Sequence, residues 1–452
     1  MRNHSITIRR VSAVSCGLAL CGLVPAALAG PYSVALNDPA NTHDAPVPGF
    51  VGPDGIGKAR LDTFTVDDNG DPIFQNPDNF VNPLFFGWAA SLVSYGRADS
   101  GTSFSNPDLA LGPVTGDNFH VVSLGDLGAS AITAGTPPGL ITVELAKPVK
   151  DLSGADFVVF ENGHISQSNY GGAGVGGIFA ELANVWVSAN GVDFVKFPTT
   201  SLTAASPGMY GSLDPTNLHN LAGKHTNAFG NSWGTPFDLA QVGLAQITHI
   251  RIVDVPGNGA FLDQAGRPIF DPWMTFGSGG FDLEAVGAVS SLTTYGEWSP
   301  LAHLTPDARG PADDPDGDGL SNLLEYAFGG VPWLNDSAAM TPALQLVTAG
   351  NEKFAQLTFL RDERLADLDY EVQVSSSLAE NAWTTIARST GGGVTQPSPG
   401  HLPLVSETAA SAIASIGVIR RVTVRDEIPV TSSNPRFLRV KITSDSAFLG
   451  NP

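Results

Sequence analysis

Four acidic residues in the segment 314–325 have the spacing of a calcium-binding loop. The segment reads DPDGDGLSNLLE and fits the twelve-residue pattern D-x-[DN]-x-[DN]-G-x5-E at every fixed position. Calcium prefers six to eight oxygen ligands, and this spacing wraps the chain around one ion. We expect the ligands to be the side chains of Asp314, Asp316, Asp318 and Glu325, the backbone carbonyl of Leu320, and Asn322 directly or through water. The alternative, an acidic turn, would leave four carboxylates repelling one another without a cation.

The same stretch lacks the helix that enters an EF-hand. The run RGPADDP before the loop holds two prolines and a glycine, whereas LSNLLEYAF predicts a short exit helix that ends at Gly329 and Gly330. This half-hand, residues 313–330, resembles the aspartate-rich loops of thrombospondin type 3 repeats and of dockerin-like segments in exported bacterial proteins. The resemblance implies a structural calcium clip that stiffens the junction between two domains, and not a signalling sensor.

Acidic residues also end several expected strands between residues 84 and 290. Strand-end carboxylates can join loop carbonyls around a structural calcium ion in a β-sandwich. We therefore expect a second calcium site that draws on Glu161, Asn162, Asp254, Asp282 and Glu284. Asp282 and Glu284 alternate along one strand, which predicts that they share a face. Two alternatives stay open: the carboxylates are solvated or cap loops, or Glu161 and Glu284 form a glycosidase pair, which requires a separation of roughly 5–9 Å.

Two loop tryptophans and a loop histidine are the expected ligand contacts. Trp233 and Trp273 lie in stretches rich in Gly, Pro and Asn, and His225 lies in a long loop. An indole ring can stack on the apolar face of a sugar while neighbouring amides bind its hydroxyl groups. The alternatives are that both tryptophans anchor their loops in the core and that His225 is a surface residue.

Short β-rich runs separated by turn signals place these residues in an all-β protein. From 84 to 290 the runs include 139–146, 156–162, 182–190, 248–255 and 281–289, and Asn190-Gly191 predicts a hairpin turn. We expect one large antiparallel, jelly-roll-like sandwich here, after an extended segment at 30–83. Residues 291–312 are expected to form a linker to the half-hand. Further strands between 331 and 452 predict a small immunoglobulin- or fibronectin-like sandwich.

The composition of the chain indicates the cellular compartment of the protein and excludes some classes of partner. Residues 1–29 carry three arginines, an apolar run and an Ala-Leu-Ala cleavage site, which together predict a secretory signal peptide. Both cysteines lie in this segment, so we expect an exported protein without disulfides. The net charge of −21 disfavours nucleic acid and anionic lipid as partners. No later run reaches the roughly 18 apolar residues that a membrane span needs.

The stretch 84–290 resembles exported, cell-surface-type β-sandwich proteins of environmental Gram-negative bacteria, many of which carry a PEP-CTERM sorting signal. The runs that carry this resemblance are DFVVFENG, ELANVWVSANGVDFVKFP, NLAGKH, GTPFDLAQVG, ITHIRIVDV and GSGGFDLEAVGAV. The half-hand followed by a small β-domain is similar to C-terminal modules of large exported proteins of Verrucomicrobia and Planctomycetes. The resemblance implies location and fold, and the chain departs from the first group by lacking the sorting helix.

These features lead to three functional hypotheses. The first is a non-enzymatic, calcium-binding protein of the periplasm, cell surface or extracellular space that binds a glycan or a surface protein through loops of its N-terminal sandwich. The second is a secreted polysaccharide hydrolase or lyase that uses acids of the same sandwich. The third is a structural component of the envelope or matrix. The sequence makes no prediction about the oligomeric state.

Overall fold

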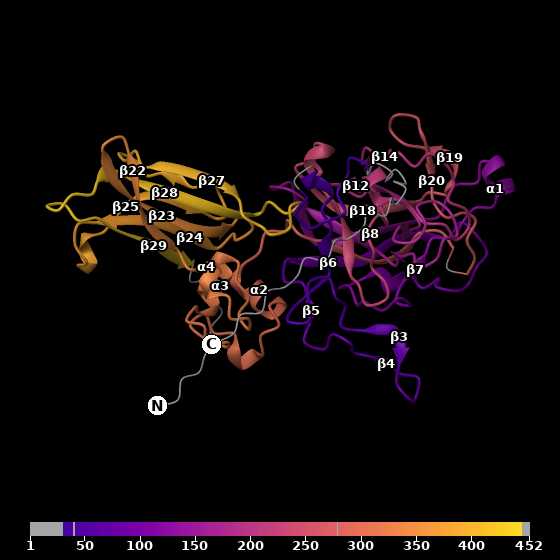
Figure 1. Cartoon of the computed structure of the whole chain (residues 1–452), viewed down its shortest axis with the longest axis horizontal. Helices are drawn as coiled ribbons and strands as arrows, with labels where there is room; N and C mark the ends of the chain where they lie inside the picture. Colours follow the sequence, from indigo (N-terminus) through magenta and orange to yellow (C-terminus); the bar gives the residue numbers. More distant parts are fainter. Residues whose placement is uncertain (1–29, 39–40, 278, 445–452) are drawn as a thin grey trace, which may run out of the picture.

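The structure, a computed structural model, describes residues 30–38, 41–277 and 279–444. Strands dominate it and build an N-terminal sandwich, drawn in purple to pink, beside a C-terminal sandwich, drawn in orange and yellow (Figure 1). The all-β, sandwich-type fold expected from the sequence is confirmed. The expected signal peptide, residues 1–29, lies outside the described residues. Within the described part, no helix is long and apolar enough to cross a membrane.

The N-terminal sandwich is built from one curled sheet of eleven strands. The strand order is β1-β17-β9-β21-β6-β8-β18-β12-β13, with β7 beside β21 and β16 beside β12. The strands are β1 (Val47–Pro48), β6 (Gly87–Gly96), β7 (Val122–Ser123), β8 (Leu140–Lys150), β9 (Phe157–Glu161), β12 (Ala183–Ser188), β13 (Val195–Lys196), β16 (Leu221–Ala222), β17 (Trp233–Phe237), β18 (Gln246–Asp254) and β21 (Asp282–Ala288). The hairpin expected at Asn190-Gly191 is present, because β12 pairs with β13 in antiparallel fashion.

Strand β6 turns this sheet into two layers. Its first residues pair with β21 through Trp88, and from Ala89 onward it pairs with β8, with two register shifts on the way. Such bulges bend a strand and raise its twist. The two halves therefore face each other across one core. Buried side chains from both halves fill this core: Ile141, Val143, Ile250 and Ile252 on one side, and Phe157, Val159, Phe237 and Val286 on the other.

The N-terminal sandwich also contains small two-stranded sheets and short helices. The strand pairs are β2 (Phe50–Val51) with β5 (Phe80–Val81), β3 (Asp62–Val66) with β4 (Pro72–Ile73), β10 (His164–Ile165) with β11 (Ile178–Phe179), β14 (Thr200–Ser201) with β15 (Leu218–His219), and β19 (Asn258–Leu262) with β20 (Pro268–Phe270). The helices here are α1 (Ala129–Thr133) and the 3-10 helices η1 (Thr42–Asp44), η2 (Pro107–Ala110), η3 (Pro215–Asn217) and η4 (Leu239–Gln241). The segment expected to be extended, 30–83, is thus part of the sandwich: β1 joins the main sheet, and Phe50 and Ala59 are buried.

Two four-stranded sheets form the C-terminal sandwich. One has the order β22 (Ala343–Ala349), β23 (Glu352–Asp362), β28 (Ile419–Pro429), β27 (Leu404–Ala409), and the other β26 (Gln396–Pro397), β25 (Thr384–Thr390), β24 (Leu368–Ser375), β29 (Phe437–Ser444). A 3-10 helix, η6 (Glu380–Ala382), lies between β24 and β25. Leu357 and Phe359 of β23 pack against Tyr370 and Val372 of β24 in the core.

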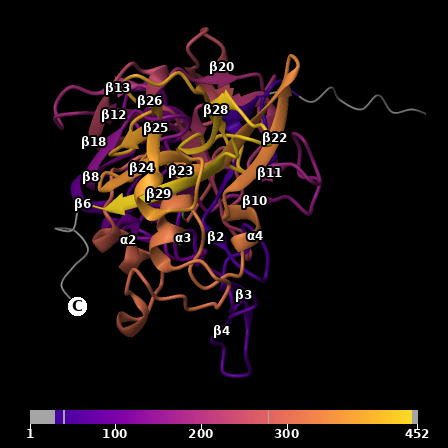
Figure 2. The same ribbon diagram turned by 90° about the vertical axis from the view of Figure 1, so that its left-hand side faces the viewer.

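The segment expected to be a linker folds onto this second sandwich. It contains α2 (Tyr295–Leu301), which begins at a capping box formed by Thr294 and Glu297, and η5 (Pro306–Ala308). Helices α3 (Asn322–Phe328) and α4 (Ser337–Met340) follow. The side chains of Tyr295 and Trp298 are buried in the C-terminal core with Phe328, because their spacing places them on one helix face. Figures 1 and 2 show α2, α3 and α4 together along the lower side of this sandwich.

The two sandwiches also contact each other directly. Ile416 and Val418 lie in a core cluster with Val47 and Phe50 of the N-terminal region. The guanidinium of Arg364 lies 3.8 Å from the ring centroid of Phe86, and it donates hydrogen bonds to backbone carbonyls of the N-terminal sandwich. The half-hand is therefore not the only link between the sandwiches, because this interface holds them together as well.

Candidate calcium site and ligand-binding groove

Carboxylates of the Asp-rich loop accept hydrogen bonds from backbone N–H groups of the same loop. Asp314 accepts hydrogen bonds from the N–H groups of Gly317 and Gly319, at 2.9 and 3.0 Å. Asp318 accepts the N–H of Leu320 at 2.9 Å. Gly319 has a φ of +95°, which requires glycine at the turn position of the pattern. The oxygens of Asp314, Asp316 and Asp318 come within 4.8 Å of one another, as the spacing predicts.

Glu325, the last residue of the calcium pattern, points its carboxylate into the interior. Its side chain is on α3 and is only 1% exposed. Neither carboxylate oxygen has a hydrogen-bond partner among the described residues. Burial, followed by the charges of Asp336 and Asp318, raises the pKa of Glu325 to about 8. An ionised carboxylate is costly in such a place unless a cation or hydrogen-bond donors compensate it.

Asp336 completes this cluster, and the sequence pattern did not include it. Carboxylate oxygens of Asp318, Glu325 and Asp336 lie within 4.8 Å of one another. Asp336 Oδ1 is buried and lacks a hydrogen-bond partner in the described part of the chain. Burial, followed by the charge of Asp318, raises the pKa of Asp336 to about 6. A side chain on Gly330 would collide with the carboxylate of Glu325, so glycine keeps this space open.

Asn322 binds backbone carbonyls through its amide nitrogen, while its Oδ1 is buried without a hydrogen-bond partner among the described residues. Its side chain is fully buried, and Nδ2 donates hydrogen bonds to the carbonyls of Ala308 and Gly310, both at 2.8 Å. The residue therefore ties the start of α3 to the segment that enters the loop. Leu320, expected to offer its carbonyl, buries its side chain. The carboxylates best placed for an ion are those of Asp314, Asp316, Asp318, Glu325 and Asp336.

Glu284, expected in a second calcium site, is a loop-capping residue. It accepts hydrogen bonds from the N–H and hydroxyl of Thr115, from the N–H of Gly116 and from Nδ2 of Asn227. The register between β21 and β9 shifts between Leu283 and Ala285, which interrupts the simple alternation that the sequence predicted for this strand. A carboxylate with four donors has little capacity left for a metal ion.

The other expected acids meet different partners. Asp282 Oδ2 accepts a hydrogen bond from Nδ2 of Asn162 at 3.4 Å. Glu161 accepts the N–H of Gly163, and Asp254 accepts the N–H of Phe281. The strand ends also bring in three buried acids that sequence reasoning missed: Asp126, Glu181 and Asp271. Their signal in the sequence was the same as that of the others, an acid next to a turn.

Trp233 and His225, two of the expected ligand contacts, line one cavity of about 370 Å³. His225 is nevertheless 4% exposed, and its Nε2 lies 3.0 Å from the carbonyl oxygen of Asp44. The Trp233 ring packs directly on Gly57, where any side chain would overlap it. Trp273 lies apart from this cavity's lining and donates its indole N–H to the carbonyl of Leu127 at 3.0 Å. The contacts of His225, Trp233 and Trp273 therefore fit side chains that anchor their own segments in the protein.

A larger groove opens beside the β10–β11 hairpin. It consists of two adjoining cavities of about 870 and 230 Å³ that share His164, Phe179 and Phe229. Tyr170 and Tyr210, 68% and 55% exposed, line its outer part with their ring centroids 6.3 Å apart. We call this the aromatic groove. Both tyrosines lie within short Gly-containing loop sequences, SNYGG and GMYGS, and this was the signal that sequence reasoning passed over.

Polar groups complete the lining of the aromatic groove. The larger cavity adds Ser166, Gln167 and Ser168, and the smaller one adds Asn118, Asn162, Glu181 and Asp282. Asn118 Oδ1 accepts the backbone N–H of Phe229 at 3.0 Å, while Nδ2 of the same side chain has no partner in the described residues. The groove therefore combines ring faces with hydrogen-bonding groups.

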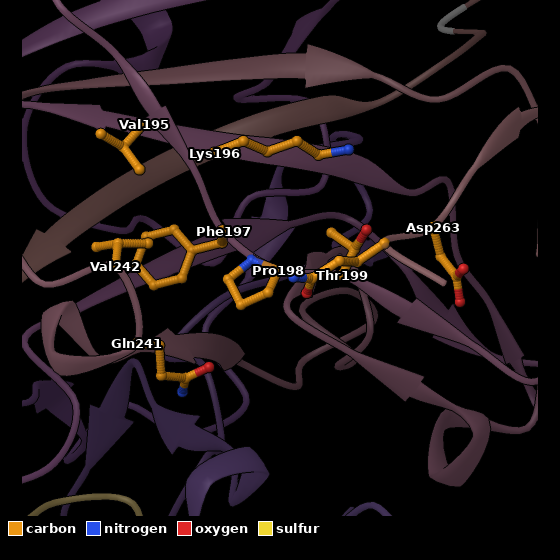
Figure 3. A pocket seen from close by; sticks show the side chains of 9 residues that line it. Val195, Lys196, Phe197, Pro198, Thr199, Gln241, Val242 and Asp263 are labelled. Carbon is orange, nitrogen blue, oxygen red and sulfur yellow. The ribbon is translucent and has the colours of Figure 1, made fainter. Parts of the chain in front are cut away.

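A third cavity, of about 410 Å³, lies at the edge of the main sheet beside β13 (Figure 3). Figure 3 shows Lys196 and Asp263 among its lining side chains, with Phe197 and Val242 on the apolar side. Asp263 is already bound by Arg267 at 2.8 Å, and Gln241 accepts a hydrogen bond from Asn220. Asp263 and Gln241 therefore have less hydrogen-bonding capacity left for a ligand, whereas Thr199 Oγ1 has no partner among the described residues.

No family model matches the chain, and no curated protein matches it either. The half-hand and the aromatic groove are therefore the features of the molecule that bear on its function.

Proposed function

We propose that this protein is an exported, calcium-stabilised binding protein that holds a neutral glycan in the aromatic groove of its N-terminal sandwich. One observation carries the proposal: Tyr170, Tyr210 and Phe229 come from separate loops and expose their rings in one groove that also contains amide and carboxylate groups. Location outside the cytoplasm rests on the expected signal peptide.

The chemistry of the aromatic groove suits a sugar chain. The apolar face of a pyranose stacks on an aromatic ring, and its hydroxyl groups need donors and acceptors around the rim. Gln167 and Ser168 are exposed and supply an amide and a hydroxyl group, and Asn118 offers an Nδ2 that has no partner among the described residues. The two cavity volumes fall within or near the range of about 300–1,000 Å³ for small-molecule sites, so a short oligosaccharide fits. Acids in the groove and the net charge of −21 disfavour an anionic glycan.

The positions of Glu161 and Glu284 favour glycan binding over glycan hydrolysis. The carboxylate of Glu284 is occupied by four hydrogen bonds, and Glu161 is 2% exposed. A general acid and a nucleophile must both reach the glycosidic bond. Neither residue is placed to do so.

Calcium in the half-hand would stabilise the attachment of α3 to the C-terminal sandwich. The support is chemical: the two carboxylate oxygens of Glu325 are buried without a partner among the described residues, and carboxylate oxygens of Asp318, Glu325 and Asp336 lie within 4.8 Å of one another. Calcium accepts such a set of hard oxygen ligands. Extracellular modules bind calcium at roughly 10⁻⁴–10⁻³ M, so the site would fill after export.

A glycan-binding screen on the full-length protein in calcium-containing buffer tests the proposal. The wild type should retain neutral oligosaccharides, and the double variant Tyr170→Ala/Tyr210→Ala should not. Phe74→Ala removes a ring that is 57% exposed outside the groove, so it serves as the matched control and should bind like the wild type. Absence of binding to any glycan by the folded wild type would remove the glycan proposal, and release of shortened sugars would favour the hydrolase instead.

A further inference from the structure

Five buried carboxylates gather at one end of the N-terminal sandwich. They belong to Asp126, Glu161, Glu181, Asp254 and Asp271, and each residue is 8% exposed or less. None of the five forms an ion pair with Lys, Arg or His within the described ranges. Acids this deeply buried are normally paired or bind a metal ion.

Backbone amides hold one oxygen of each carboxylate in this cluster. The consecutive N–H groups of Gly280 and Phe281 donate to Glu181 Oε1 at 3.0 Å and to Asp254 Oδ1 at 2.8 Å. The N–H of Thr275 donates to Asp126 Oδ2 at 3.1 Å. Metal-ligating carboxylates are oriented in this way, with one oxygen hydrogen-bonded and the other directed at the ion.

Two of the remaining oxygens have nothing to bind. Asp126 Oδ1 and Asp254 Oδ2 are inaccessible to water and lack a hydrogen-bond partner in the described part of the protein. Both side chains are more than nine-tenths buried. Burial raises the pKa of Asp254 well above its usual range, and the nearby charge with the largest effect is that of Asp126. Each of these carboxyl groups therefore disfavours ionisation of the other unless a cation lies between them.

Gly280 leaves room for a third oxygen beside this pair. A side chain on Gly280 would meet the carbonyl oxygen of Gly125 at 2.6 Å and Asp254 Oδ1 at 3.0 Å, so these two oxygens border the same small space. The φ of +73° at Gly280 also disfavours any other residue.

We infer that a second calcium ion binds between Asp126 and Asp254, next to Gly280, with the carbonyl of Gly125 as a further ligand. All donors are hard oxygens, and the irregular set suits calcium better than magnesium, which demands a near-ideal octahedron. The site differs from the one expected from the sequence: it keeps Asp254, omits Glu284 and adds Asp126. Because Glu181 shares Thr275 and Gly280 with these ligands and also lines the aromatic groove, the ion would stiffen that part of the groove.

Calcium stoichiometry of the full-length protein tests this inference. After equilibration with millimolar calcium, the wild type should hold two ions per chain by elemental analysis, Glu325→Gln one, Asp254→Asn one, and the double variant none. Glu284→Gln, in a fully hydrogen-bonded carboxylate, should still hold two. A wild type with one ion that Glu325→Gln loses and Asp254→Asn keeps would overturn the second site and leave the half-hand standing. A wild type without calcium would overturn both.

Terbium luminescence on the folded wild type covers the case in which Asp254→Asn does not fold. Trp273 donates to the carbonyl of Leu127, the residue after Asp126, so its indole lies near the inferred ion. Terbium bound there should be sensitised by Trp273, and Trp273→Phe should remove that emission while the half-hand emission stays. Emission that is unchanged in Trp273→Phe would count against the inference.

Discussion

Asp318 connects the Asp-rich loop to the start of the C-terminal sandwich through Ser337. Its Oδ2 accepts the backbone N–H of Ser337 at 2.7 Å and that of Asp336 at 3.0 Å, and the Ser337 hydroxyl donates to the carbonyl oxygen of Asp318 at 3.1 Å. These bonds fold the segment after α3 back over the loop. They bring the Asp336 carboxylate to Glu325, and this return of the chain turns an open loop into a closed candidate site.

Removal of calcium should lower the stability of the wild type. At a calcium concentration 10 to 100 times the dissociation constant, binding to the folded state adds about 1–3 kcal/mol. A thermal melt with calcium should therefore show a higher Tm than one with chelator. In Glu325→Gln the difference contributed by the half-hand should vanish, because the amide removes the charge and one ligand oxygen. A wild type with the same Tm in both buffers would contradict calcium binding.

Asp336→Asn should weaken calcium binding at the half-hand. Loss of one carboxylate ligand is expected to reduce the affinity about tenfold, or about 1.4 kcal/mol. Asp307→Asn makes the same change of net charge at an exposed position and should leave the affinity within a factor of two. Titration calorimetry of both variants makes the comparison, and equal affinities would show that Asp336 is not a ligand.

Single ring removals in the aromatic groove should weaken glycan binding by moderate amounts. Tyr170→Ala and Tyr210→Ala should each reduce the affinity about fivefold, since one stacking contact contributes on the order of 1 kcal/mol. Both residues are exposed, so their Tm values should match that of the wild type. A fall in Tm together with affinity would point to a structural role instead.

The buried ion pair between Asp44 and Lys224 should contribute strongly to the free energy of unfolding. This contribution should require both residues. Lys224 Nζ lies 3.3 Å from Asp44 Oδ1, and the lysine is fully buried. Asp44→Ala leaves the ammonium group without its counter-charge and should destabilise the fold by roughly 3–5 kcal/mol. The double variant Asp44→Ala/Lys224→Met should recover part of this loss in urea unfolding, and a simple sum of the single effects would argue against the pairing.

Acid should destabilise the protein through His225. Burial, followed by the charge of Lys224, lowers the pKa of His225 to about 3, whereas an unfolded histidine titrates near pH 6.5. The unfolded chain therefore binds more protons between these values, and stability falls as the pH falls from 6.5 towards 3. Compared with His225→Gln, the wild type should lose roughly tenfold in its folding equilibrium per pH unit in this window. Parallel pH profiles of the two proteins would contradict this.

The strands and the half-hand were accessible to sequence reasoning because their signals are local. Alternating apolar residues and the Asn190-Gly191 turn depend only on close neighbours in the chain, and β12 and β13 pair as expected. Likewise, Asp314, Asp316 and Asp318 belong to one short loop, so their spacing alone brings their oxygens together.

The spacing of acids and amides did not predict the backbone contacts of Asn322 and Glu284, for a physical reason. Each residue type can ligate calcium, but each can also satisfy backbone groups that a loop leaves without partners. Asn322 meets the carbonyls of Ala308 and Gly310, and Glu284 meets the amides of a loop more than 160 positions earlier. Those partners come from segments whose position the spacing of a motif does not predict.

The sequence by itself determined an all-β protein with an acidic loop suited to calcium, because periodicity, turn residues and ligand spacing act over a few residues. Only the tertiary structure decided which distant groups meet: Asp336 with Glu325, Asp126 with Thr275, and Tyr170 with Tyr210 in one groove. These encounters depend on how the curled sheet and the returning segments pair across long separations. Pairing of this kind is set by the packing of the whole core, and no local pattern records it.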